Sequence, residues 1–385
     1  MAGYLFLISK DEAEALEACM QTGIYSTIIN PPNGTWGRPY ESTIADYLSM
    51  KAGDNVYFFM DRMIYGVGKL IDIGGACKYK NYPQASTPFE YVYKDIRKEL
   101  LLDTGFGSEN LRWLCVFEPY PAFFKQGVDM DEVLSSSPTK IRMIRAMQGV
   151  SFIKLDDEEN KAVRDLIVFR NRNVLSDKKH RYTFNDNSHR KIGKKVSSIY
   201  TLSAAEIMDL RVDQNGVLRT EMALECGLIE LLATAVPEGE ILGRWEYISH
   251  QVIASPFKPL AYAARMDIFG YNYVPKIPDE YKTVSDYLVI ELKKDGADST
   301  CIEQTLRYVE WIKQEYAQGD YSRIKAFLVA SNFDSSALDV LKTSAIRYYT
   351  EGGHSPKTAV WKELTLLKYR YDQTSRKLIL EPTEQ

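Results

Sequence analysis

Residues 287–294 join an apolar run to charged side chains that could do chemistry. The run 287–290 is short and apolar, which predicts a buried strand. Glu291 and Lys293 end that strand two residues apart, so their side chains share one face. An unpaired charge inside a protein is costly. A bound divalent cation would offset that cost and explain why an acid and an amine stand at the end of a buried strand.

Polar residues also stand on two neighbouring segments. Upstream, Asp267 lies in the apolar segment 266–269, which predicts another strand. Downstream, residues 300–316 have a helical pattern, in which Gln304 and Tyr308 lie four apart and share a face. The alternative to a metal site is a set of ordinary ion pairs between the acids and nearby basic residues.

An amphipathic helix is predicted over 219–232, before these strands. Glu221 and Glu225 are four residues apart and therefore lie on one face of it. Residues 244–253 then predict a strand, and residues 324–330 a later buried strand. The predicted order is helix, three strands, helix, strand.

This order, together with Asp267, the Glu291-x-Lys293 pair and the helix with Gln304 and Tyr308, resembles the PD-(D/E)XK nuclease superfamily. Within it, the pattern looks similar to EndoMS/NucS-like endonucleases and to the nuclease domain of Shedu-type phage-defence proteins. The sequence departs from these relatives by a long connection, 270–286, where they have a tight hairpin. The resemblance implies an α/β domain with a mixed central sheet.

The resemblance also implies roles for these residues. Asp267, Glu291 and the carbonyl of Leu292 would hold Mg²⁺ (or Mn²⁺), which prefers oxygen ligands. Lys293 would orient the attacking water or stabilise charge in the transition state.

The helices would complete the site. Gln304 and Tyr308 would contact water or phosphate. Relatives carry an acid on the helix before the first core strand. Glu225 or Glu221 could fill that position, and Glu225 is our choice.

The first half of the chain has a different pattern. Residues 53–59 and 62–71 predict a β-hairpin, and the segment 149–155 predicts a late strand before a helix. This layout resembles the PUA-like fold, a small β-barrel, in its EVE-type and YTH-type forms. Such domains hold a modified or flipped base in an aromatic pocket, which here implies the candidates Trp36, Tyr57, Phe59, Tyr65 and Trp113. Alternatively, these aromatic side chains fill the barrel core.

Trp36 differs from the other aromatic candidates because it stands among turn residues. We therefore expect it to be exposed and to bind nucleic acid.

Residues 171–199 are rich in basic side chains with aromatic residues between them, a pattern that suits a phosphate backbone and its bases. We expect a linker or mobile loop here that contacts nucleic acid, and a purely solvated linker is the alternative. The basic candidates are Lys178, Lys179, Arg181, Lys194 and Lys195.

The length of 385 residues predicts two or three domains. We expect a PUA-like α+β recognition domain over 1–170, the basic linker over 171–199 and the nuclease domain over 200–385. The net charge of −4 excludes a uniformly basic coat but allows a local basic channel. Five scattered cysteines argue against zinc and disulfides and favour a cytoplasmic protein. No apolar run reaches membrane-spanning length.

Together these patterns predict a metal-dependent endonuclease that acts on double-stranded DNA, in phage defence or in modification- or structure-dependent restriction. A homo-oligomer, dimer or tetramer, is expected because two strands need two active sites. The alternatives are an inactive nucleic-acid-binding protein and an RNA-directed nuclease. The chain has no GxSxG elbow and no P-loop, which argues against serine hydrolysis and ATP-driven translocation.

Overall fold

The structure is a computed structural model that describes residues 1–9, 13–30, 34–144, 152–234, 236–254, 264–278, 282–351 and 355–383. The chain divides into two compact units, unit 1 (Met1–Ser203) and unit 2 (Ala204–Gln385). Among the helices of these ranges, none is long and apolar enough to cross a membrane.

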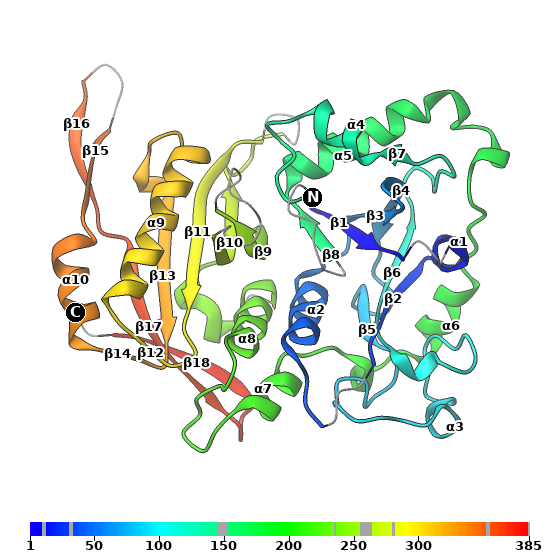
Figure 1. Cartoon of the computed structure of the whole chain (residues 1–385), viewed down its shortest axis with the longest axis horizontal. Helices are drawn as coiled ribbons and strands as arrows, with labels where there is room; N and C mark the ends of the chain where they lie inside the picture. Colours follow the sequence, from blue (N-terminus) through cyan, green and yellow to red (C-terminus); the bar gives the residue numbers. More distant parts are fainter. Residues whose placement is uncertain are drawn as a thin grey trace. The chain divides into compact units, whose positions relative to one another are not determined.

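Within the described residues, unit 1 holds an eight-stranded mixed sheet, curved as a half barrel (Figure 1). The strand order is β2-β6-β4-β3-β1-β8, while β5 pairs with β6 and β7 with β4. The strands are β1 (Gly3–Leu7), β2 (Ile24–Ile28), β3 (Asn55–Met60), β4 (Met63–Leu70), β5 (Lys78–Lys80), β6 (Leu111–Pro119), β7 (Val128–Asp129) and β8 (Phe152–Leu155). The predicted hairpin is the antiparallel β3–β4 pair. The predicted segment 149–155 is seen as β8, and its first part, 149–151, lies outside the described residues.

Unit 1 has an aromatic core on its sheet. Buried rings from β1, β2, β3, β6 and β8 pack against one another, namely Phe6, Tyr25, Phe58, Phe117 and Phe152. The helices around the sheet are α1 (Ala13–Thr22), α2 (Arg38–Ser49), α3 (Tyr93–Ile96), α4 (Met130–Ser136), α5 (Asp157–Arg170) and α6 (Asn187–Lys195).

Trp36 is buried, contrary to the expectation of an exposed aromatic. Its side chain is 2% exposed, and its indole Nε1 donates a hydrogen bond to the Ser86 carbonyl at 2.7 Å. Its ring packs against Trp113, which is also buried. The prediction from the turn-rich sequence was wrong. An indole contributes most to stability when its ring is buried and its N–H still has a hydrogen-bond acceptor.

The other aromatic candidates also lie in the packed interior or at its edge. Tyr57 is fully buried and donates to the Asn160 side chain at 2.7 Å, whereas Phe59 and Tyr65 are half-buried. The structure therefore places these rings where the alternative interpretation, a filled core, puts them.

Residues 171–199 are not a linker but pack within unit 1. The Tyr182 amide donates to the Phe123 carbonyl at 2.9 Å. Helix α6 buries His189 and Ile192 against the sheet. The basic composition hid an amphipathic helix that packs its large apolar side chain, Ile192, into the core of the unit.

Glu159, on α5, is a fully buried carboxylate that holds a neighbouring loop. Its two oxygens accept the backbone N–H groups of Arg142 at 3.2 Å, Met143 at 3.1 Å and Ile144 at 3.0 Å. Burial and, to a smaller extent, the charge of Asp156 raise the pKa of Glu159 to about 8, although these hydrogen bonds lower it. The carboxyl group is thus a structural anchor of unit 1.

We expect Glu159→Ala to lower the free energy of unfolding of unit 1 by about 3 kcal/mol or more, because it leaves buried N–H groups without acceptors. Urea unfolding of the full chain measures the loss. The control is Glu158→Ala, which removes an exposed carboxylate from the next position. Equal unfolding midpoints for the two variants would contradict the anchoring role.

Within its described residues, unit 2 is built on a six-stranded mixed sheet of order β18-β17-β13-β11-β10-β9. Its strands are β9 (Tyr247–Ile253), β10 (Arg265–Tyr273), β11 (Val284–Leu292), β13 (Ile324–Ala330), β17 (Leu364–Asp372) and β18 (Lys377–Pro382). β11 pairs antiparallel with β10 and parallel with β13. The helices are α7 (Ala205–Arg211), α8 (Glu221–Thr234), α9 (Ser299–Glu315) and α10 (Ser335–Ser344). The predicted order of helix, three strands, helix and strand is confirmed as α8-β9-β10-β11-α9-β13.

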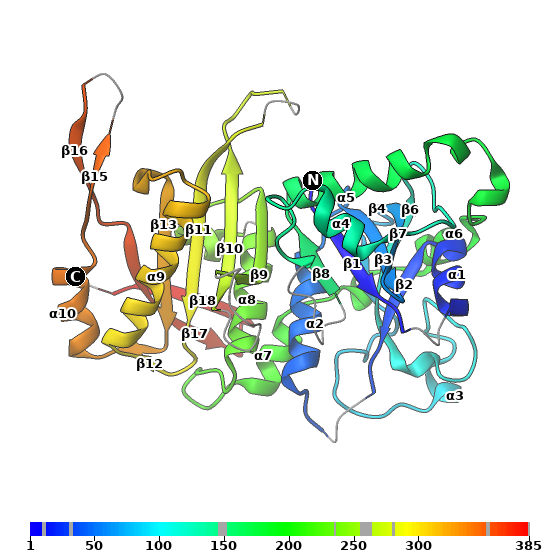
Figure 2. The same cartoon turned by 45° about the horizontal axis from the view of Figure 1, so that its top comes forward.

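Short strands complete unit 2. β12 (Gly296–Ala297) pairs with β14 (Asn332–Phe333), and β15 (Arg347–Glu351) pairs with β16 (Lys357–Trp361). The β15–β16 ribbon extends away from the central sheet of unit 2 in both views (Figures 1 and 2). Helix α9 runs along β11 and β13.

The long connection 270–286 begins and ends in strand, because residues 270–273 belong to β10 and residues 284–286 to β11. The antiparallel pairing of β10 with β11 runs from Ile268–Ile290 out to Tyr273–Val284. The insertion therefore lengthens the hairpin without disturbing its base. Beyond the Ile268–Ile290 pair, the Leu292 amide donates to Asp267 Oδ2 at 2.8 Å, which brings Asp267 beside Glu291 at the end of β11.

Candidate active site

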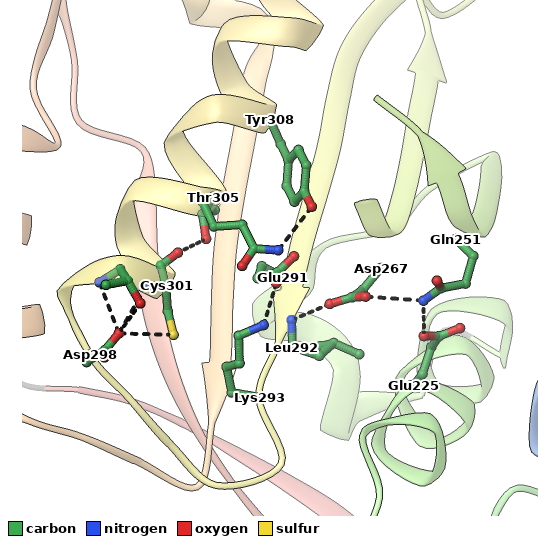
Figure 3. Close-up of polar contacts among 12 residues, drawn as sticks. Glu225, Gln251, Asp267, Glu291, Leu292, Lys293, Asp298, Cys301, Thr305 and Tyr308 are labelled. Atoms are coloured by element: carbon green, nitrogen blue, oxygen red, sulfur yellow. Dashed lines mark hydrogen bonds and ion pairs between the residues drawn. The ribbon is translucent and has the colours of Figure 1, made fainter. Parts of the chain in front are cut away.

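The end of β11 carries the first part of the site. β11 lies between two partner strands, so Glu291 is only 1% exposed. The Lys293 ammonium donates to Glu291 Oε1 at 2.6 Å, and the Lys293 amide donates to the Val329 carbonyl at 2.9 Å (Figure 3). The pair predicted from spacing therefore lies side by side, in direct contact.

Asp267 joins this pair from β10. Its Oδ2 accepts the Leu292 amide at 2.8 Å, and its Oδ1 accepts Gln251 Nε2 at 3.2 Å (Figure 3). The carboxylate is thus held by the strands on both sides of its own.

Both carboxyl groups at the ends of β10 and β11 have raised pKa values. Burial raises the pKa of Asp267 well above its usual value, and the charges of Glu291 and Glu225 raise it further. Burial also raises the pKa of Glu291, although the Lys293 ammonium opposes this. For Lys293, burial lowers the pKa, but the charge of Glu291 outweighs it and the net shift is upward. Burial is therefore the largest cause of both carboxyl shifts, and the charges of two other acids add to the shift of Asp267.

A divalent cation fits this arrangement. Glu291 Oε2 is buried and makes no hydrogen bond, and Asp267 stands beside it with a raised pKa. Among the described residues, no three or more His, Cys, Asp or Glu side chains are grouped so as to hold a metal ion. Two carboxylates are a small set, but Mg²⁺ keeps several waters and is often bound through one or two carboxylates. The carbonyl of Leu292 remains a proposed third ligand.

Helix α9 contributes polar side chains beside the carboxylates. The Asp298 side chain caps it by accepting the amides of Thr300 at 3.0 Å and Cys301 at 3.3 Å. One turn further, Gln304 Nε2 donates to the Tyr308 hydroxyl at 3.0 Å. Burial raises the pKa of Tyr308, and the charges of the two strand carboxylates add to this, which places its hydroxyl within their electrostatic reach.

Glu225, on α8, reaches the site through another side chain. Its Oε1 accepts His250 Nδ1 at 2.5 Å, and its Oε2 accepts Gln251 Nε2 at 2.9 Å. The same Gln251 nitrogen also donates to Asp267. Sequence reasoning missed His250 and Gln251, because only the β9–β10 register shows that these residues flank Asp267.

The basic candidates of unit 1 divide into exposed and engaged side chains. Lys178, Lys179 and Lys194 are exposed, and Arg181 is half-buried. Lys195 instead donates its ammonium to the carbonyls of Lys98 at 2.7 Å and Leu100 at 2.6 Å. This engages Lys195 within the unit, whereas the three exposed lysines keep their charges in solvent.

Comparison with known proteins gives little to build on. No family model matches the chain, and no curated protein matches it. Among solved structures, a repair endonuclease from Pyrococcus abyssi is similar over 26% of this chain and 34% of its own, with 24% identity and a TM-score of 0.17. An EndoMS-dsDNA2 complex is similar over 20% of this chain and 27% of its own, with 25% identity and a TM-score of 0.16. The chain thus spans about a third and about a quarter of these structures, and with such low TM-scores the site geometry must support any function.

Proposed function

We propose that unit 2 is a metal-dependent DNA endonuclease of the PD-(D/E)XK type, which hydrolyses phosphodiester bonds in double-stranded DNA. One observation carries this proposal: the half-buried Asp267 stands beside the buried Glu291, which has an unpartnered oxygen and is in contact with Lys293. Such a cluster is unfavourable for a fold alone and suits a site that binds a cation and a phosphate.

The residues of the site would have different roles in hydrolysis. Bound Mg²⁺ or Mn²⁺ would polarise the phosphate and lower the pKa of a water. Asp267 and Glu291 would hold the ion, and Lys293 would place positive charge where negative charge develops on the phosphate. Tyr308 and Gln304, linked by their hydrogen bond, would orient water or phosphate from α9.

Unit 1 is proposed as a PUA-like recognition domain that senses a feature of the DNA, in phage defence or in modification- or structure-dependent restriction. Its half-barrel sheet and its exposed basic side chains support this reading. The whole chain is proposed to act as a homo-oligomer, because cutting both strands of a duplex needs two sites.

The test is cleavage of a labelled panel in the presence of Mg²⁺. The panel holds circular, linear, mismatched and base-modified DNA duplexes, with RNA added. We expect wild type to cut at least one DNA duplex, and EDTA or Glu291→Gln to stop the cutting. Cutting of RNA alone would reassign the substrate, and tight DNA binding without any cutting would replace the enzyme with a binding protein.

The exposed lysines give a separate prediction. We expect Lys178→Glu with Lys179→Glu to weaken DNA binding about uniformly across sequences and to reduce the slope of log K against log salt by about 1–2. Fluorescence anisotropy over a salt series measures both. Lys140→Glu with Lys161→Glu, also exposed and equal in charge change, is the matched control. Equal losses in both double variants would assign the effect to net charge alone and not to this site.

A further inference from the structure

Gln251 has an unusual backbone for a residue inside a strand. It lies in β9 with φ 51°, in the left-handed region that residues with side chains rarely adopt. In a regular strand, successive side chains point to opposite faces. Here the left-handed residue breaks that alternation, and both His250 and Gln251 bond to the same carboxylate, Glu225.

Glu225 is fully satisfied by these two neighbours. Its side chain is 2% exposed, and each of its oxygens accepts one hydrogen bond, from His250 at 2.5 Å and from Gln251 at 2.9 Å. An ionised carboxylate only accepts hydrogen bonds, so both partners must donate. Both oxygens of Glu225 are therefore engaged by side chains of β9.

The Gln251 amide carries the link onward to Asp267. Its single nitrogen donates to Glu225 and, at 3.2 Å, to Asp267 Oδ1, while the Leu292 amide holds Asp267 Oδ2 at 2.8 Å (Figure 3). A carboxylate held at both oxygens has its plane fixed. That orientation would otherwise vary by rotation about the bond to Cβ.

We infer that Gln251 is a positioning residue: its amide, oriented by Glu225 and anchored through His250, fixes the Asp267 carboxylate in the geometry that binds the cation. Helix α8 then acts on the site through Gln251, and Glu225 is not itself a ligand. The inference rests on the proposed function, because it assigns Asp267 to the cation.

The first test measures Mn²⁺ binding to the DNA-free full chain by isothermal titration calorimetry. Gln251→Met keeps the length of the side chain and removes both hydrogen bonds. We expect it to weaken Mn²⁺ binding about 10–100-fold, the usual effect of losing a group that orients a ligand. The matched control is Asn272→Leu, at the far end of β10. It removes another bridging amide, which donates to the Arg244 carbonyl and accepts the Glu246 amide.

A double-mutant cycle separates positioning from direct ligation. If Glu225 acts only through Gln251, then Glu225→Ala added to Gln251→Met costs no further Mn²⁺ affinity. His250→Asn, which can still donate to Glu225, should keep the affinity that His250→Ala loses. Thermal unfolding of each variant shows whether it is folded before titration.

The outcomes are distinct. Wild-type affinity in folded Gln251→Met, or additive losses in the cycle, would overturn the inference and leave the proposed endonuclease standing. A wild-type chain that binds no Mn²⁺ would overturn the proposed function, and the inference with it.

Discussion

Lys293→Met is expected to reduce kcat for DNA cleavage about 10²–10³-fold, the usual cost of removing one charged donor from a hydrolytic site. The Lys293 ammonium lies 2.6 Å from Glu291 Oε1, at the edge of the carboxylate cluster, and its side chain is 24% exposed. It can therefore face both the buried acids and a phosphate from solvent. Methionine keeps the length and apolar stem of the side chain and removes only the charge.

Single-turnover cleavage measures the loss, and two further readings define it. Mn²⁺ affinity should not fall, because a positive charge leaves the cation's neighbourhood. The control is Lys294→Met, since Lys294 is the next residue but pairs with Asp295 at 2.6 Å. A comparable loss in both variants would mean that Lys293 has no special place in the reaction.

Asp267→Asn is expected to abolish metal-dependent cleavage and, in the metal-free protein, to raise the free energy of unfolding at neutral pH by about 1–2 kcal/mol. The variant removes the charge of a half-buried carboxylate, which the charges of Glu291 and Glu225 both oppose. A residue kept for function at the expense of the fold behaves in this way. Thermal or urea unfolding without metal, beside the cleavage assay, measures both effects.

The stability difference between Asp267→Asn and wild type should depend on pH. Because the pKa of Asp267 is raised in the folded protein, the native state holds its proton more tightly than the unfolded chain. The stability from this group is complete below the ordinary carboxyl pKa, about 4, and is lost as pH rises through the raised folded value. The advantage of Asp267→Asn over wild type should therefore be small in acid and grow with pH.

The matched control for the loss of a carboxylate is Asp286→Asn, on β11, where the acid only accepts a hydrogen bond from Ser285. Its difference from wild type should not grow with pH in this way. Saturating Mn²⁺ should restore wild-type stability relative to Asp267→Asn, because the ion binds the folded state alone. A wild type that stays as stable as Asp267→Asn at every pH would show that the carboxylates do not repel each other.

The sequence was most informative where local chemistry decides structure. The apolar run 287–290 and the period of residues 300–316 predicted β11 and α9, because burial and helical spacing act over a few neighbours. Glu291 lies in β11 and Lys293 directly follows its last residue, Leu292, so their contact follows from a spacing of two. The order of elements in unit 2 could be predicted for the same reason.

Local patterns failed where burial or register is set by distant residues. Trp36 stands in a turn-rich stretch but is buried, because it donates a hydrogen bond to Ser86 and packs on Trp113. Both partners are distant in sequence, so no local pattern reveals them. Residues 171–199 look like a charged linker, yet Ile192 and Val196 pack in a core cluster of unit 1. The composition of a segment gives its number of charged residues, whereas its packing depends on the face of the helix that those residues occupy.

By itself, therefore, the sequence determined the acid–amine pair at the end of β11, the helix that follows it and the order of the strands. Only the tertiary structure decided that the lengthened hairpin keeps Asp267 beside Glu291. It alone decided that the left-handed Gln251 ties Asp267 to Glu225. The physical reason is that strand register and hydrogen bonds between distant segments depend on long-range pairing, which no local pattern of residues specifies.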